Sequence, residues 1–265
     1  MSVLYHERHG TGEPLLLVTG FAISAAVFEP VLGLYAAHFE CILYDHRGSG
    51  RSHGRAPAPR TMGALADDAA GLLDELGIER AHVYGVSMGG MVAQEIALRH
   101  PDRVRTLILG CTSPGGPRAA RPGVRELAAL AGGTVGERSP RAAALFSADF
   151  RRRHPRRVRE LLRPFNAHPT PRAAVVAQIA ASALHDTCSR LERIAAPTLV
   201  LHGERDHLVP LANGRTLARL IPGAELRVIR GAGHAYALER PHAALEALLT
   251  WLTRTREEAH VAPDR

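Results

Sequence analysis

Residues 82–90 of the chain read His82-Val83-Tyr84-Gly85-Val86-Ser87-Met88-Gly89-Gly90. The apolar run at 82–84 predicts a short strand, and the pattern at 88–99 predicts a helix that stops before Pro101, since proline does not continue a helix. A Gly-x-Ser-x-Gly segment between a strand and a helix is typical of a sharp, strained turn that lifts a serine hydroxyl clear of a sheet. We therefore interpret Ser87 as a nucleophile. The alternative is a tight turn with a capping serine.

Small residues surround this serine. A sharp turn brings the flanking chain so close that side chains two positions away must be minimal, and Gly85 and Gly89 meet that requirement. Gly90, Ala93 and Ala97 would let the following helix pack close to the sheet.

Apolar runs that predict strands recur along the rest of the chain, at 14–18, 41–44, 106–109, 198–201 and 226–229. Helical patterns lie between several of them, at 62–76, 88–99 and 243–252. Strands that alternate with helices indicate an α/β fold, with a mostly parallel sheet covered by helices on both faces.

One long stretch interrupts the alternation. Residues 112–195 contain only helical patterns separated by proline and glycine clusters, so we interpret them as a helical lid inserted into a core of residues 1–111 and 196–265. An arginine run covers 151–163, and Val158, Leu161 and Leu162 within it share the spacing of one helix face. We interpret the arginines as a solvated face; recognition of an acidic group is the alternative.

A serine hydroxyl needs a base to accept its proton and an acid to orient that base. Asp206 follows the predicted strand 198–201, and His234 lies in a glycine-rich loop after the strand 226–229. The order Ser87, Asp206, His234 is the order in which this architecture carries a catalytic triad. The competing candidates are His207, beside Asp206, and the pair His185-Asp186 in the lid.

Together these features resemble the α/β-hydrolase superfamily. The segment 44–52 looks like its D-x-R-G-x-G-x-S loop, and the segments 197–203 and 233–234 look like those that carry its acid and base. The resemblance implies an eight-stranded, mostly parallel sheet with a lid after the sixth strand. Asp45, Arg47 and Gly48 could bind substrate, but turn and ion-pair roles are favoured.

The segment Thr19-Gly20-Phe21 departs from many relatives, which have histidine where Thr19 stands. The resemblance implies that the backbone N–H groups of Phe21 and Met88 form an oxyanion hole. Backbone donors do not depend on the side chain, so we keep both assignments.

Serine at the nucleophile position disfavours the epoxide-opening and halide-displacing relatives, which use aspartate. We expect a serine hydrolase that cleaves a carboxylic ester or lactone through an acyl-enzyme intermediate, without a cofactor. The elbow looks like those of small-ester hydrolases, enol-lactonases and methylesterases. The alternatives are a carbon–carbon bond hydrolase, a thioesterase, a perhydrolase, or a ligand receptor or scaffold without turnover.

Composition and the lack of certain motifs argue against several other classes of function. The chain has 265 residues and a net charge of +7, and all 33 of its basic residues are arginine, a bias that a GC-rich genome explains. We find no nucleic-acid-reading motif, no H-E-x-x-H metal motif and no dinucleotide fingerprint, and so expect neither nucleic acid nor metal as a partner. The apolar runs are too short to span a membrane, residues 1–14 lack a secretory signal, and the odd number of cysteines fits reduced thiols in the cytoplasm. No pattern sets an oligomeric state.

Overall fold

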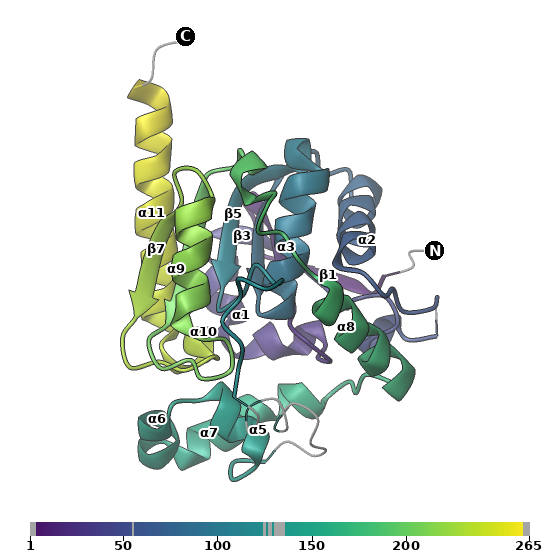
Figure 1. Cartoon of the computed structure of the whole chain (residues 1–265), viewed down its shortest axis with the longest axis vertical. Helices are drawn as coiled ribbons and strands as arrows, with labels where there is room; N and C mark the ends of the chain where they lie inside the picture. The colour runs from purple at the N-terminus through teal and green to yellow at the C-terminus, as the bar shows by residue number, and fades with distance from the viewer. Residues whose placement is uncertain (1–3, 55, 124–125, 127–128, 130–135, 262–265) are drawn as a thin grey trace.

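A seven-stranded sheet forms the centre of the molecule (Figure 1). The computed structural model describes residues 4–54, 56–123, 126, 129 and 136–261. The strands are β1 (His6–His9), β2 (Glu13–Val18), β3 (Phe39–Tyr44), β4 (Ala81–Val86), β5 (Val104–Gly110), β6 (Thr198–Gly203) and β7 (Glu225–Ile229). Their order is β1-β3-β2-β4-β5-β6-β7; β1 pairs antiparallel with β3, and every other pair is parallel.

Helices connect and cover these strands. They are α1 (Glu29–Ala36), α2 (Met62–Glu75), α3 (Met88–Arg99), α5 (Pro140–Leu145), α6 (Ala148–Arg153), α7 (Pro155–Leu162), α8 (Arg172–Leu184), α9 (Leu211–Leu220), α10 (Tyr236–Glu239) and α11 (Pro241–Val261). The Thr61 hydroxyl accepts the Ala64 N–H and begins α2, as an N-cap residue does. Among the described helices, none is both long and apolar enough to cross a membrane.

Alternating side chains divide the buried apolar residues between the two faces of the sheet. Leu15 and Leu17 of β2 belong to one cluster, with residues of α1, α10 and α11, whereas Leu16 and Val18 belong to the other, with residues of α2, α3 and α9. Successive side chains of a strand point to opposite faces, so a strand buried on both faces is apolar at every position. This explains why the β2 sequence shows no polar alternation.

The predicted α/β class and the six predicted strands are confirmed, but the count of eight strands is wrong for the described residues, which form seven. The helical insertion accordingly follows β5, not a sixth strand. One strand, β1, precedes the first parallel strand, and it is one of the two edges of the described sheet because its only strand partner there is β3. The strand β1 was not predicted, since its four residues, His6 to His9, are all polar.

In its described residues, the segment between β5 and β6 carries the helices α5 to α8 and none of the named strands. In Figure 1, α5, α6 and α7 lie together below the sheet. The arginine run is split between α6 and α7, and Val158, Leu161 and Leu162 of α7 are buried, as the spacing predicted. These three side chains share an apolar cluster with β2 and α11, so this part of the insertion packs onto the core.

Two buried histidines make the fold sensitive to acid. Burial lowers the pKa of His82 to about 4, with help from the charge of Arg105, and burial likewise lowers the pKa of His185 to about 4. An unfolded histidine has a pKa near 6.5. As the pH falls from about 6.5 to about 4, the unfolded chain therefore takes up protons that the folded chain does not, and the folded state loses stability through this window.

We predict that His82→Gln flattens the dependence of unfolding free energy on pH between about pH 6.5 and 4, by up to about 1.4 kcal/mol per pH unit. Glutamine keeps a hydrogen-bonding group near Thr106 but does not titrate. Urea denaturation at several pH values measures the slope. The exposed His53 provides the control, His53→Gln, which should leave the slope as in the wild type. An unchanged slope in His82→Gln would contradict the assignment.

Candidate active site

Ser87 lies in the turn between β4 and α3, and its backbone is strained. Its φ of 59° and ψ of −122° fall in a region that residues with a side chain rarely adopt. The Ser87 N–H donates to the Gly110 carbonyl (2.8 Å), and the Ser87 carbonyl accepts the Thr112 hydroxyl (2.7 Å). The turn is thus held by β5, and the Ser87 side chain stands, partly exposed, at the carboxyl edge of the sheet.

Two other non-glycine residues of the described chain have a positive φ, and each lies in the loop that follows a strand. They are Ala22 (φ 55°), after β2, and Cys111 (φ 42°), after β5. Such strain gathers at functional sites, because the surrounding structure must hold it in place. The strained positions therefore mark the edge that carries Ser87.

Close packing explains why glycine flanks the serine. A Cβ built on Gly89 would lie 2.1 Å from the Val18 carbonyl oxygen, and one built on Gly85 would lie 2.2 Å from the Gly89 carbonyl oxygen. Neither separation is possible between real atoms, so the beginning of α3 reaches β2 only without these side chains. The predicted reason for both glycines is confirmed.

Asp206 and His234 meet across two loops that follow β6 and β7. The Nδ1 of His234 lies 2.8 Å from Oδ2 of Asp206, and both residues are buried. Oδ1 of Asp206 accepts the N–H groups of Leu208 (2.9 Å) and Val209 (2.8 Å). Burial by itself would raise the pKa of Asp206, but His234, His202 and the Val209 N–H outweigh it and lower that pKa, so the carboxylate is charged at neutral pH.

A profile described as the alpha/beta hydrolase fold matches residues 13–241. The chain belongs to the α/β-hydrolase family.

Similar proteins carry names that point to different activities. A Caulobacter protein (strain K31) named "Putative carbamate hydrolase RutD" is 34% identical over 94% of this chain and 96% of its own. A thermophilic esterase from Thermogutta terrifontis is similar in structure, with a TM-score of 0.77 and 31% identity over 95% of this chain and 93% of that one. A further solved structure, of an N-acyl homoserine lactone degrading enzyme, has a TM-score of 0.78 and 30% identity over 93% of this chain and 96% of that one.

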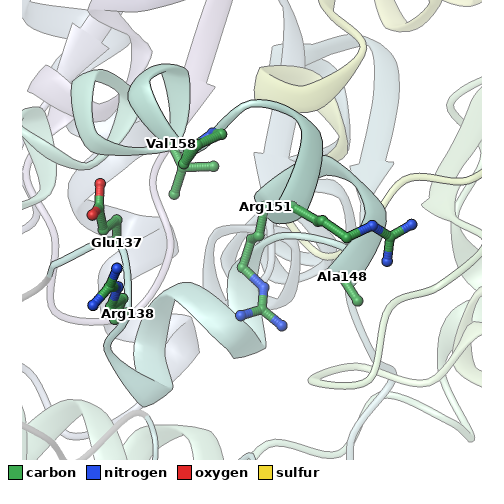
Figure 2. Close-up of a pocket in the computed structure, with 7 residues that line it drawn as sticks. Glu137, Arg138, Ala148, Arg151 and Val158 are labelled. Atoms are coloured by element: carbon green, nitrogen blue, oxygen red, sulfur yellow. The ribbon is translucent and has the colours of Figure 1, made fainter.

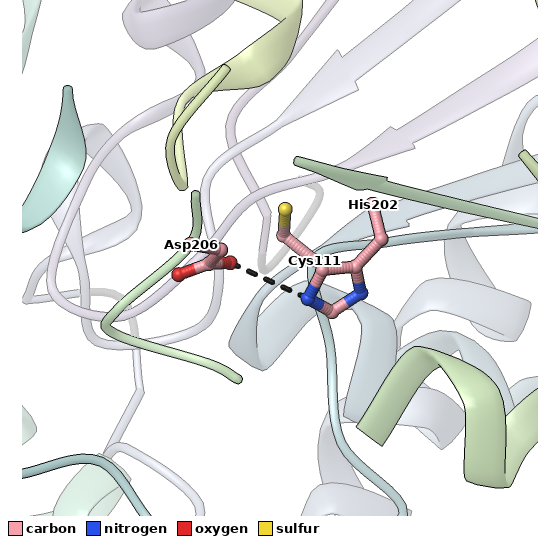
Figure 3. Close-up of side chains that lie close together, drawn as sticks. All are labelled: Cys111, His202 and Asp206. Atoms are coloured by element: carbon pink, nitrogen blue, oxygen red, sulfur yellow. Dashed lines mark ion pairs between the residues drawn. The ribbon is translucent and has the colours of Figure 1, made fainter. Parts of the chain in front are cut away.

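His202 is a second histidine beside Asp206 of this α/β-hydrolase, and no sequence pattern predicted a role for it. Its Nε2 lies 2.8 Å from the Val209 carbonyl oxygen and 3.6 Å from Oδ2 of Asp206 (Figure 3). The carbonyl only accepts, so Nε2 carries a hydrogen. Burial lowers the pKa of His202, which keeps the ring neutral. A buried, neutral His202 thus adds a partial positive charge beside the carboxylate.

Cys111, His202 and Asp206 place three potential metal ligands within 4.8 Å of one another. Protein groups already bond to most of their possible ligand atoms, since Nε2 of His202 bonds to the Val209 carbonyl and Asp206 accepts three N–H groups. The sulfur of Cys111 accepts the Gly203 N–H at 3.3 Å, and Nδ1 of His202 is the one ligand atom of the three residues without a hydrogen-bond partner among the described residues. Burial also raises the pKa of the Cys111 thiol well above its ordinary value, which disfavours the thiolate that binds metals. The cluster fits support of Asp206 better than a metal centre.

The loop of His234 is fixed by Glu239, which no sequence pattern predicted. Glu239 accepts the N–H of Gly233 (2.9 Å) and, from the insertion, the N–H (2.7 Å) and hydroxyl (2.8 Å) of Ser147. In addition, the Ala235 N–H donates to the Leu145 carbonyl (2.8 Å). The His234 loop is therefore bonded directly to the inserted segment.

The loop after β2 lies against the serine. A Cβ built on Gly20 would lie 3.4 Å from the Ser87 Cβ, so Thr19-Gly20-Phe21 approaches the elbow closely. The His46 Nε2 lies 3.0 Å from the Thr19 carbonyl oxygen and holds this loop from behind. Met88, the other expected oxyanion donor, is the first residue of α3, where backbone N–H groups have no partner within the helix.

The D-x-R-G segment has the structural roles that were favoured. The buried Asp45 accepts the N–H groups of Ala25 (2.6 Å) and Arg51 (2.7 Å), and Arg47 pairs with Asp68 at 2.8 Å. Gly48 has a φ of 81°, which suits its turn. These contacts join the segment to the loop after β2.

The competing acid and base candidates are placed elsewhere. His207 is exposed although it neighbours Asp206 in the sequence. Asp186 is exposed and accepts the Cys188 N–H. His185 is buried, and its Nδ1 lies 4.0 Å from Oε1 of Glu95 in α3. None of these three is bonded to His234 in the described residues.

The arginine run borders a surface pocket formed by the insertion (Figure 2). Its lining includes Arg138, Arg151 and Arg152, together with Glu137 and Val158. Arg152 pairs with Asp149 at 2.6 Å, and Glu137 pairs with Arg159 at 2.8 Å, so acidic neighbours already compensate part of this charge. Exposed pairs of this kind contribute about 0–1 kcal/mol each, which agrees with a solvated face.

We predict opposite effects for two glycine-to-alanine changes in helices of this α/β-hydrolase. Gly89→Ala should lower the thermal stability strongly or prevent folding, because its Cβ would collide with β2. Gly71→Ala in α2 meets no atom within 4 Å and should raise the stability by about 0.5–1 kcal/mol, since alanine is the better helix former. Thermal denaturation of both variants checks this, and equal behaviour would contradict the packing argument.

Proposed function

We propose that this α/β-hydrolase is a serine hydrolase that cleaves a carboxylic ester or lactone with Ser87, Asp206 and His234. The observation that carries the proposal is the 2.8 Å contact between His234 and the buried Asp206, at the sheet edge where the strained Ser87 stands. A nucleophile elbow alone is a short pattern. An acid–base pair on later strands, in the order the fold requires, supplies the partner that the serine needs.

The proposed reaction uses each residue in turn. His234 accepts the Ser87 proton on Nε2 while the Ser87 oxygen attacks the carbonyl carbon, and Asp206 holds the ring through Nδ1 and stabilises its charged form. The N–H groups of Phe21 and Met88 stabilise the oxyanion, an effect of about 3–4 kcal/mol per donor. The protonated His234 then gives its proton to the leaving group, and water releases the acid from Ser87.

The low pKa of Asp206 supports this assignment. The acid must stay charged while the histidine is charged, and the pKa of Asp206 is held below its ordinary value, although burial opposes this, by His234, His202 and the Val209 N–H. The two backbone bonds to Oδ1 also leave Oδ2 free to face His234. The acid is therefore oriented as well as charged.

The similar proteins favour a small carbonyl substrate. The esterase and the lactone-degrading enzyme support the ester or lactone assignment, because both substrates have an alkoxide leaving group. A carbamate is the second candidate, favoured by the name of the Caulobacter relative, which matches nearly the whole chain. Its carbonyl is less reactive than that of an ester, so the same elbow would cleave it more slowly.

We assign residues 112–195 as a lid over this site and the flanking segments as the core. The assignment is supported by the contacts of Ser147 and Leu145 with the His234 loop, which bring the insertion next to the proposed base. The arginine face of α6 and α7 has no part in the proposed reaction.

Ser87→Ala should lower ester hydrolysis by about 10⁶-fold, the loss seen when a triad nucleophile is removed, while the fold is retained. A panel of p-nitrophenyl esters, lactones and aryl carbamates measures turnover. A fluorophosphonate adduct mapped by mass spectrometry should lie on Ser87. Activity in Ser87→Ala, or an adduct on another residue, would contradict the mechanism, and labelling without turnover would favour a ligand receptor.

Asp206→Asn should lower kcat by about 10⁴-fold, because asparagine cannot hold the histidine in its working tautomer. The matched control is Asp186→Asn, which changes an exposed aspartate of the insertion and should stay within a few-fold of the wild type. His234→Ala and His207→Ala form the parallel pair for the base. Equal losses in either pair would show that the acid or the base is misassigned.

A further inference from the structure

Gln178 is a buried glutamine of α8 that reaches out of the insertion to the loop after β2. Its side chain is sequestered, with the residue only 2% exposed. The Oε1 atom accepts the Ala22 N–H at 2.8 Å, and Nε2 donates to the Ser49 hydroxyl oxygen at 2.8 Å. One amide from the insertion therefore joins two core loops, the loop after β2 and the loop after β3.

The bond to Ala22 falls at a strained and critical position. Ala22 has a φ of 55°, an unfavourable conformation for alanine that its surroundings must hold. Ala22 directly follows Phe21, the proposed oxyanion donor. Gly20, on the other side of Phe21, packs against Ser87. The direction of the Phe21 N–H therefore depends on how the Ala22 peptide is held.

Three polar groups hold this loop at three points. His46 holds the Thr19 carbonyl before Phe21 (3.0 Å), and Asp45 holds the Ala25 N–H further along (2.6 Å). Both belong to the core. Gln178 holds the Ala22 N–H, the point nearest to Phe21, and is the one of the three that the insertion supplies.

We propose that Gln178 is a positioning residue, through which α8 sets the oxyanion-hole loop for catalysis. The inference rests on the proposed function and deepens it, because it assigns a residue to the geometry of that site. A misaligned donor acts on the developing oxyanion more than on the bound substrate, so kcat is the quantity that Gln178 controls. Displacements near 1 Å reduce rates by about a hundred-fold.

The test is Gln178→Met, which keeps the length of the side chain and removes both hydrogen bonds. We expect kcat on a p-nitrophenyl ester to fall by about ten- to a hundred-fold, with KM within about three-fold of the wild type. Gln178→Glu should restore kcat to within a few-fold. The new carboxyl group can accept the Ala22 N–H in either protonation state. When it is charged, the Ser49 hydroxyl donates to it; when it is protonated, it donates to the Ser49 hydroxyl oxygen.

The matched control is Gln94→Met, another buried glutamine that links core and insertion. Its amide donates to the Gly90 and Ser113 carbonyls (3.1 and 3.0 Å) and accepts the Thr187 hydroxyl (2.6 Å), away from the loop after β2. We expect a similar loss of thermal stability but kcat within about three-fold. Equal losses of kcat in the two variants, a rise of KM at constant kcat, or no recovery in Gln178→Glu would overturn the proposal.

Failure of the proposed function gives a different result. If the wild type neither turns over the panel nor forms a Ser87 adduct, the serine mechanism fails, and the role of Gln178 in catalysis fails with it. If the wild type is active and labelled on Ser87 while Gln178→Met keeps its kcat, only the role of Gln178 is wrong. Backbone hydrogen exchange at Ala22, which needs no turnover, should be faster in Gln178→Met, and unchanged exchange would also overturn the proposal.

Discussion

The close approach of α3 to β2 is the constraint on which the site depends. The first turn of α3 lies so near the Val18 carbonyl that only glycine fits at 89, and this approach holds Ser87 in its strained conformation. The same approach brings the loop after β2 against the serine. The proposed nucleophile and the proposed oxyanion donors are therefore positioned by one packing contact, which the hydrogen bonds of Gly110 and Thr112 to the turn reinforce.

The structure stabilises the charge of the buried Asp206, whereas the surface arginines have no such role in the proposed site. The carboxylate is buried, yet two backbone N–H groups and two histidines keep it charged and oriented. The arginines of α6 and α7, by contrast, lie where water screens them and where acidic neighbours already pair with several of them. The net charge of +7 is thus a weak guide to function, and a few buried polar groups are a strong one.

Local sequence determined most of the fold and the identity of the proposed catalytic residues. Buried parallel strands are apolar at every position, which makes them visible as short runs, and the strand–turn–helix pattern around Ser87 needs glycines at fixed spacing. Asp206 and His234 were predictable because each follows such a strand, and carboxyl ends of parallel strands meet at one edge. The polar edge strand β1 carried no such signal, so it was missed and the strand count was wrong.

Only the tertiary structure identified the residues that support the site. Gln178 and Glu239 lie in helices outside every motif, and no motif gives His202, within the segment 197–203, a role of its own. Their hydrogen bonds join residues between 6 and 156 positions apart. A buried amide or carboxylate looks like any other polar residue in a sequence, because its role depends on which N–H groups the folded chain brings to it. The sequence by itself therefore determined which groups are proposed to react, whereas the packing of the insertion onto the core decided which side chains hold them in place.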